Sequence, residues 1–225
     1  MVQAFVVVVD RDRENPFRGG LTDHVIIQNL ADTDTADYDI LILDADRNSV
    51  EQITELLAGQ KDVSALHIIS HGDNANLQLG DQILNTSNIA DYRDTFRSWS
   101  SHLSEDADLM LYGCNLAASD QGTAMMELIG LWTGADIAAS TNITGHESLG
   151  GDWVLEYKLG DIESDIVPTA TTQEAWIHTL AEGVAGTVAT EQKISNTEGG
   201  LSTTLEIDDL FGRAIASIGD LNQDG

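Results

Sequence analysis

The chain has 225 residues, of which 42% are hydrophobic and 21% are charged. Ten Lys and Arg residues against 38 Asp and Glu residues give a formal net charge of -28 at pH 7. So acidic a chain is repelled by phosphate backbones and anionic headgroups, and we therefore expect no nucleic acid among its partners. The sequence also lacks an apolar run long enough for a membrane span, so we expect no membrane insertion. Its N-terminal segment has no basic region ahead of the apolar run, so no signal peptide is predicted there.

The N-terminal part alternates short apolar runs with amphipathic segments, a pattern typical of a parallel sheet covered by helices. Strands are predicted at 4–9, 40–43, 65–69, 109–112 and 136–139, a hairpin at 77–79 with 82–84, and an antiparallel edge strand at 153–159. Helices are predicted at 49–58, 86–103 and 120–132, the first with Ser49 as N-cap and Gly59 as its stop. We therefore predict a doubly wound α/β fold with a mostly parallel sheet and helices on both faces.

Three segments are expected along the chain. Residues 1–165 form the α/β domain, residues 166–204 a linker with short strands, and residues 205–225 the start of another unit. Because the last segment stops inside a motif, we expect the chain to be the front piece of a longer polypeptide.

The candidate catalytic residues are His71 and Cys114, each directly after a predicted strand, in HIISHG and in LYGCN. The carboxyl ends of neighbouring parallel strands meet at one edge of a sheet, which is where ligands bind in such folds. An imidazole that takes the proton of a thiol makes the sulfur a nucleophile, provided the two groups meet at an accessible place. The N–H groups of Gly72 and Cys114 are predicted to form an oxyanion hole.

Other polar residues follow the remaining strands. Asp44 and Asp46 follow the second strand, and Ser140 and Thr141 follow the fifth, so all four are candidates for lining the cleft. Each also has a simpler interpretation, because Asp residues here often cap the next helix and Ser and Thr are common in loops. Cys114 alone is similarly explained as a small apolar residue of the core.

The segments HIISHG and LMLYGCN resemble the His and Cys boxes of caspase-like (clan CD type) cysteine peptidases. The Gln-Ala-Cys-x-Gly box of the caspases themselves is absent. The ordered set LDADRNSVEQITELLAG, HIISHG, LQLG, LYGCNLA, GADIAAST and GGDWVLEY is more similar to an uncharacterised bacterial domain at the N-terminal end of large surface or secreted proteins. This second resemblance covers roughly residues 4–160.

The resemblance implies a caspase-like peptidase domain without a cofactor, with Cys114 as nucleophile and His71 as general acid and base. The expected substrate is a peptide or protein, which includes the chain itself, and the expected location is secreted or at the cell surface. The acidic composition favours a basic residue at the cleaved position.

The tail, DLFGRAIASIGDLNQDG, resembles the opening of an FG-GAP repeat of integrin α-chains. Asp220, Asn222 and Asp224 have the alternating oxygen-ligand spacing of a calcium loop whose later ligands are missing, so calcium is the one expected cofactor. Two further hypotheses therefore remain open. One is a non-catalytic interaction module of a calcium-dependent adhesin, and the other is a domain that cleaves its own polypeptide once.

Overall fold

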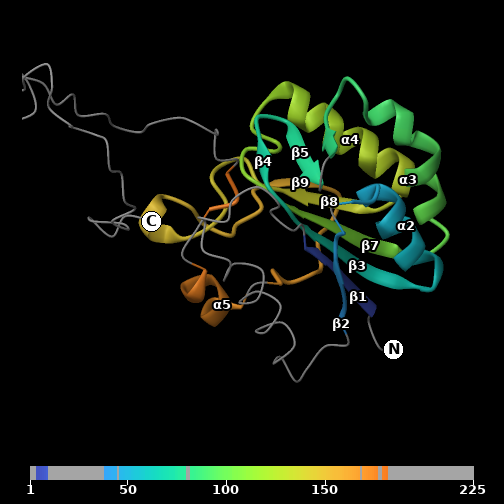
Figure 1. Ribbon diagram of the computed structural model, residues 1–225, viewed down its shortest axis with the longest axis horizontal. Helices are drawn as coiled ribbons and strands as arrows, with labels where there is room; N and C mark the ends of the chain where they lie inside the picture. The colour runs from blue at the N-terminus through green and yellow to red at the C-terminus, as the bar shows by residue number, and fades with distance from the viewer. Residues whose placement is uncertain are drawn as a thin grey trace, which may run out of the picture. The chain divides into compact units, whose positions relative to one another are not determined.

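A computed structural model describes residues 4–9, 38–44, 46–79, 82–167, 169–176 and 179–181, and for residues 4–9 and Tyr38 only the backbone. Its main element is a six-stranded sheet with the order β2-β1-β3-β7-β8-β9 (Figure 1). The strands are β1 (Ala4–Val9), β2 (Tyr38–Ile42), β3 (Val63–Ile69), β7 (Leu103–Tyr112), β8 (Asp136–Ala139) and β9 (Tyr157–Leu159). The first five strands in this order are parallel and β9 is antiparallel to β8, so the predicted α/β class is confirmed.

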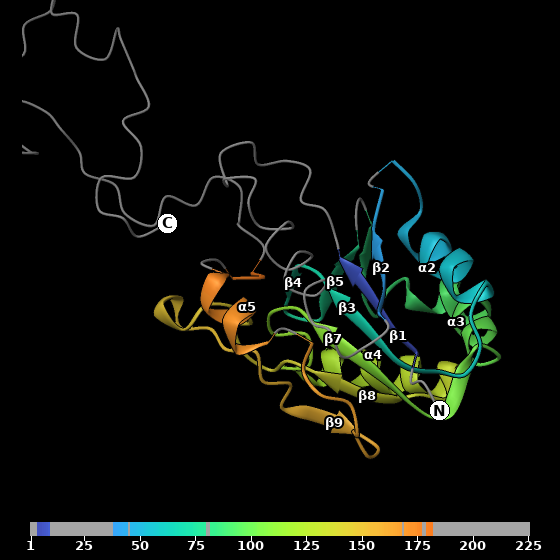
Figure 2. The ribbon, with the colours of Figure 1, turned by 90° about the horizontal axis from the view of Figure 1, so that it is seen from below.

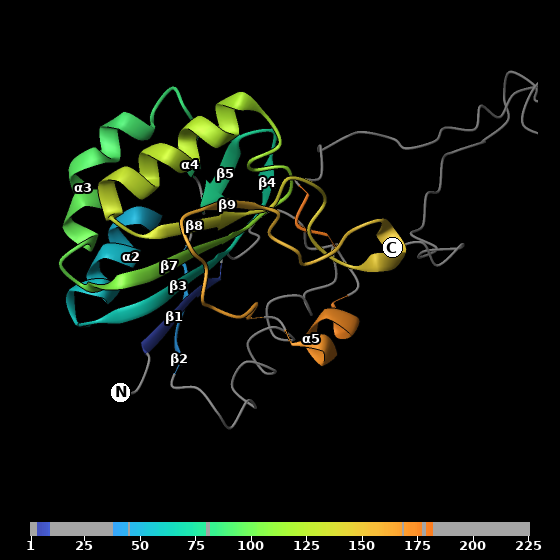
Figure 3. The ribbon, with the colours of Figure 1, turned by 180° about the vertical axis from the view of Figure 1, so that it is seen from behind.

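Three helices cover one face of the sheet (Figures 1 and 3). They are α2 (Ser49–Ala58), α3 (Arg93–Trp99), which follows the 3-10 helix η1 (Ile89–Tyr92), and α4 (Asp120–Thr133). Their apolar side chains share one core with alternate residues of the strands. A small antiparallel sheet of β4 (Gly72–Asp73), β5 (Asn76–Leu79) and β6 (Gln82–Leu84) adds three leucines to that core.

The opposite face of the sheet carries a second core. Alternate residues of β3, β7 and β8 face this way, because successive side chains of a strand point to opposite sides. Its members on the strands and just beyond them are Ile69, Met110, Tyr112, Cys114 and Ala138. This core is covered by the part of the chain that follows β8, which includes the 3-10 helix η2 (Glu147–Leu149) and the short helix α5 (Ala170–Ala175) (Figure 2). Its residues in the second core are Trp153, Leu155, Val167, Trp176 and Leu180.

Three hydrogen-bonded polar groups lie within the second core. The Val167 N–H donates to the Tyr112 hydroxyl oxygen at 3.2 Å, and that hydroxyl lies 3.2 Å from His67 Nδ1. The Tyr112 hydroxyl therefore links the Val167 backbone to the His67 ring. Burial lowers the pKa of His67 to about 3, so this histidine is a neutral core residue at physiological pH.

Several element boundaries differ from the sequence-based prediction. Asn48, not Ser49, caps α2, because its side chain accepts the N–H of Glu51 at 3.0 Å, while Ser49 is buried and donates to the Leu79 carbonyl. The predicted stop at Gly59 is confirmed. The expected helix at 86–103 is shorter, since β7 already begins at Leu103. The first half of β7 is charged and lies where the pairing with β3 shifts register. Because this half has no apolar run, the sequence pattern does not indicate a strand there.

The edge strand is also shorter than predicted. Only Tyr157–Leu159 pairs with β8, whereas Trp153 and Leu155 turn into the second core. No helix in the described ranges is long and apolar enough to cross a membrane.

The neutral state of His67 predicts a loss of stability in acid. As the pH falls below about 6.5, the unfolded chain binds a proton that the folded chain resists until about pH 3. Between pH 7 and 4.5 this site should lower the unfolding free energy by about 2.5 kcal/mol. His67→Asn keeps an acceptor near Tyr112 but removes the titratable group. The variant should therefore be less stable than wild type at pH 7, and the difference between their unfolding free energies should shrink by about that amount at pH 4.5. Urea unfolding at both pH values measures this, and a gap that does not change with pH would contradict it.

Candidate functional site

The register of β3 and β7 brings His71 and Cys114 to the same place. Ile69 is paired with Tyr112, and the ladder continues with the Ser70 N–H donating to the Tyr112 carbonyl at 3.0 Å. His71 and Cys114 each follow two residues after that pair, at the carboxyl edge of the sheet. Because two residues restore the side-chain direction, Cys114 stays on the side of the second core and is one of its members.

The two glycines of these motifs allow close packing at the edge. A Cβ on Gly72 would lie 2.7 Å from a Leu116 side-chain atom and 3.2 Å from the Cys114 carbonyl oxygen. A Cβ on Gly113 would lie 3.1 Å from the Ser70 carbonyl oxygen. Neither glycine has a positive φ. Their role is to let the segments after β3 and β7 touch.

The Cys114 sulfur is fully buried, with 0% of the residue exposed. The Thr144 N–H donates to it at 3.2 Å, and the thiol in turn lies 3.6 Å from the Thr144 carbonyl oxygen. The pKa of the thiol is raised to about 11, mainly by burial and also by the Asp73 carboxylate, while hydrogen bonds with the Thr144 and Leu180 backbone oppose the rise. In this arrangement the sulfur is protonated at neutral pH.

The residue that joins the two motifs is Leu180. Its carbonyl oxygen accepts the Gly72 N–H at 3.1 Å and lies 3.3 Å from His71 Nδ1. Its own N–H donates to the Thr144 carbonyl at 2.8 Å, beside the Cys114 sulfur. A peptide unit of the chain itself thus bridges the His71 and Cys114 segments.

The residues on either side of Leu180 continue this contact. Thr179 forms an antiparallel bridge with Gly145, and Ala181 forms a parallel bridge with Gly72. We refer to Thr179–Ala181 as the covering segment. It is held through its backbone from both sides, in the manner of a peptide bound by strand addition.

Residues 22–180 match the family of DUF4347 domains, which is described as a domain of unknown function. The chain belongs to the DUF4347 family. The matched range contains His71, Cys114 and Leu180. No curated protein matches the chain.

The other predicted cleft residues of this DUF4347 domain stabilise local structure. The Asp44 carboxylate accepts the Asp46 N–H at 3.0 Å in an exposed turn, and the Gln52 side chain holds the Asp44 backbone through two hydrogen bonds of 2.8 Å. Neither Asp is the N-cap of α2. Asp220, Asn222 and Asp224 lie outside the described residues.

Ser140 and Thr141 shape the loop that leads to Thr144. Ser140 is buried and donates to the Asn142 carbonyl at 3.0 Å. Thr141 donates to the Glu156 carboxylate from its backbone at 2.8 Å and from its hydroxyl at 3.1 Å. Both residues therefore position the loop that covers the sulfur.

Three residues of this site were missed in the sequence analysis. Thr144 and Leu180 act through backbone groups, which leave no residue-type signal, and Leu180 is 109 residues from His71. Asn115, directly after Cys114, has a left-handed φ of 55° and donates its N–H to the Asn142 carbonyl at 2.7 Å. Asparagine tolerates this conformation better than most residues.

A group of carboxylates lies where β7, β8 and the chain after β9 meet. Asp108, Asp136 and Glu163 offer oxygens within 4.8 Å of one another. Asp108 accepts the N–H groups of Glu163 and Ser164 at 3.2 and 2.8 Å, and Asp136 accepts that of Asp161 at 3.0 Å. Burial, and then the neighbouring Asp108, raise the pKa of Glu163. Oxygen ligands of this kind suit a hard cation such as calcium, but the contacts that the structure shows are those that anchor the chain after β9.

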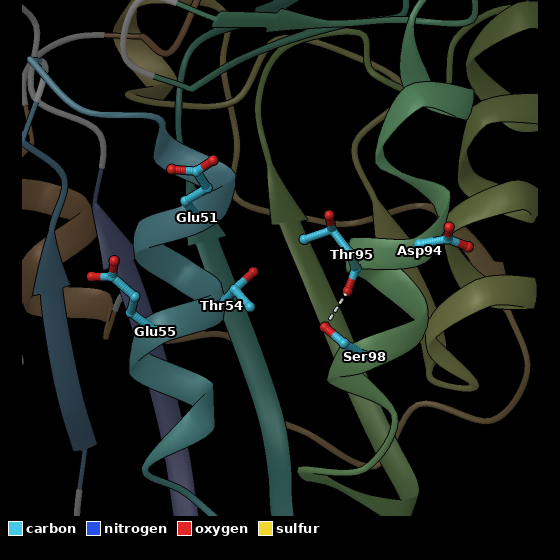
Figure 4. A pocket seen from close by; sticks show the side chains of 6 residues that line it. All are labelled: Glu51, Thr54, Glu55, Asp94, Thr95 and Ser98. Carbon is cyan, nitrogen blue, oxygen red and sulfur yellow. Dashed lines mark hydrogen bonds between the residues drawn. The ribbon is translucent and has the colours of Figure 1, made fainter.

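A shallow groove on the helical face is separate from these residues. It is lined by side chains of α2 and α3, namely Glu51, Thr54, Glu55, Asp94, Thr95 and Ser98 (Figure 4). Glu55 is paired with Arg47 at 2.7 Å, and the Thr54 hydroxyl accepts the Trp99 indole N–H at 2.8 Å. The groove contains neither His71 nor Cys114.

The buried thiol predicts slow labelling that depends on the covering segment. Native protein should react with a small disulfide reagent far more slowly than unfolded chain, with a pH midpoint near 11 rather than about 8.5. Leu180→Ala removes side-chain atoms packed in the second core and should raise the rate at pH 8 by about tenfold or more. Leu131→Ala, at a leucine of α4 that is 76% exposed, is the matched control and should leave the rate unchanged. Equal rates for native and unfolded wild type would contradict the buried arrangement.

Proposed function

We propose that this DUF4347 domain is a caspase-like cysteine peptidase domain in which Cys114 is the nucleophile and His71 the general acid and base. One observation carries the proposal. The carbonyl oxygen of Leu180 accepts the Gly72 N–H and lies within hydrogen-bond distance of His71 Nδ1. This carbonyl is next to the segment that holds the Cys114 sulfur. A peptide carbonyl held next to both the histidine and the segment of the nucleophile supports attack by that sulfur.

The chemistry follows from these groups. The sulfur attacks the peptide carbonyl carbon, and His71 takes the thiol proton and then gives it to the leaving nitrogen. The carbon–nitrogen bond breaks and leaves a thioester, which water hydrolyses to a carboxylic acid and the free thiol. The negative charge that develops on the oxygen is stabilised by the Gly72 N–H, with the Cys114 N–H as the second predicted donor.

The raised pKa of Cys114 describes the covered state of this site. Burial, to which the covering segment contributes, is the main cause that raises this pKa, and the hydrogen bond from the Thr144 N–H lowers it. In the proposed mechanism the thiol loses its proton to His71 as the carbon–sulfur bond forms, so a standing thiolate is not needed. The Thr144 N–H is then placed to stabilise charge on the sulfur.

A second candidate function is favoured by the same burial. A cysteine with no exposed surface and a pKa above that of a free thiol is what a non-catalytic interaction module is expected to have. In that case Cys114 is a core residue and the covering segment is part of the fold. This candidate retains the expected role in a calcium-dependent adhesin, with calcium at Asp220, Asn222 and Asp224 of an FG-GAP-like repeat. In both cases we propose a secreted or surface location.

The two candidates predict different behaviour toward a peptide probe. A peptidyl acyloxymethyl ketone should label Cys114 of a peptidase, and His71→Ala should slow labelling about 10²-fold or more because the base is lost. Cys114→Ala should abolish labelling, whereas Ser98→Ala in the groove of the helical face should not change it. Intact mass spectrometry measures the label, and circular dichroism confirms that each variant is folded. Labelling of wild type at the rate of His71→Ala would contradict the peptidase proposal.

A further inference from the structure

We propose that the Leu180–Ala181 peptide bond of this chain is the substrate of its own His71 and Cys114 site. The inference rests on the proposed function and identifies the bond that is cut. The domain would therefore cleave its own polypeptide once, directly after the residue that covers the sulfur.

The Leu180 carbonyl oxygen has hydrogen-bonding partners of the kind that a reacting carbonyl needs. Its oxygen faces two hydrogen-bonding groups of the site, the Gly72 N–H at 3.1 Å and His71 Nδ1 at 3.3 Å. Donors on a carbonyl oxygen draw electron density from its carbon and stabilise the oxyanion that forms on attack. The bond from Gly72 is also part of the parallel bridge between Gly72 and Ala181, so the contact with His71 Nδ1 is the one that points to the reaction.

The residues around the bond are fixed as in a bound peptide. The bridge between Thr179 and Gly145 holds the chain before the bond, and the bridge between Ala181 and Gly72 holds it after the bond. The Leu180 N–H donates to the Thr144 carbonyl at 2.8 Å, and this same loop donates its Thr144 N–H to the sulfur at 3.2 Å. One loop therefore positions both the nucleophile and the residue that it attacks.

The Leu180 side chain occupies an apolar pocket that is already formed. It is 3% exposed and packs in the second core with Cys114, Trp153 and Trp176. A pocket of this composition selects an apolar side chain and disfavours a basic one, because a buried charge without a partner is costly. We therefore infer a preference for leucine at the cleaved position, in place of the basic residue that the net charge suggested.

The products are defined by the balance of the reaction. The sulfur bonds to the Leu180 carbonyl carbon, the carbon–nitrogen bond to Ala181 breaks, and the thiol proton passes through His71 to the Ala181 nitrogen. Water then hydrolyses the thioester, which leaves a Leu180 carboxylate and the free thiol. One fragment ends at Leu180 and the other begins at Ala181, so the whole sheet and both motifs remain in the first fragment.

The test is the intact mass of the full 225-residue chain, incubated at neutral pH with and without calcium chloride. Wild type should yield fragments 1–180 and 181–225, and N-terminal sequencing of the second should begin Ala-Glu-Gly. Cys114→Ala and Ala181→Pro should both remain intact, the first because the nucleophile is lost and the second because proline hinders cleavage of the bond, and circular dichroism confirms that both variants are folded. The bonds Leu57–Ala58 and Leu116–Ala117 join the same residue types within the fold and should stay uncut as internal controls.

The possible failures are distinguishable. Cysteine-dependent cleavage at another bond, or an uncut wild-type chain whose Cys114 is still labelled in a His71-dependent way, would overturn this inference and leave the proposed function standing. A chain that is neither cut nor labelled in either buffer would overturn both. A faster reaction of lysine than of leucine acyloxymethyl ketones would argue against the leucine pocket.

Discussion

The parallel pairing of β3 with β7 is the constraint on which the rest of this structure depends. It sets Ile69 against Tyr112, and so places His71 and Cys114 at one level on the carboxyl edge of the sheet. Two glycines then let the segments that follow approach each other to contact distance. A shift of one residue would turn Cys114 to the helical face and away from the covering segment.

The second core explains why the covering segment stays in place. Tryptophan and leucine side chains after β8 bury their apolar surface against the sheet, and the Val167 N–H and the buried pair of Tyr112 and His67 add directed contacts. Apolar burial of this kind is worth about 1.5–3 kcal/mol per large side chain, so the chain that carries Leu180 is anchored well before it reaches the sulfur. Burial of Cys114 is thus a consequence of how the chain closes over its own sheet. It is compatible with a core cysteine, and our proposal rests on the position of the Leu180 carbonyl beside the Gly72 N–H and His71 Nδ1.

Much of the scaffold was predictable from the sequence, because its signals are local. Apolar runs gave the strands 4–9, 136–139 and the hairpin, and the spacing of Val50, Ile53 and Leu57 gave α2. The meeting of the His71 and Cys114 segments was also predictable, since parallel neighbours end at the same edge. Other features were not: the charged start of β7 concealed a strand, and the role of Leu180 depends on backbone atoms brought from 109 residues away. Asn48 replaced Ser49 as the cap because Ser49 is needed by the Leu79 carbonyl, a contact that no local pattern shows.

The most direct measurement of the central claim is a crystal structure of the intact Cys114→Ala chain. Our account predicts an unbroken Leu180–Ala181 bond whose carbonyl oxygen accepts from the Gly72 N–H and lies within hydrogen-bond distance of His71 Nδ1. A structure in which that carbonyl points away from both groups, with residue 114 enclosed only by aliphatic side chains, would contradict it.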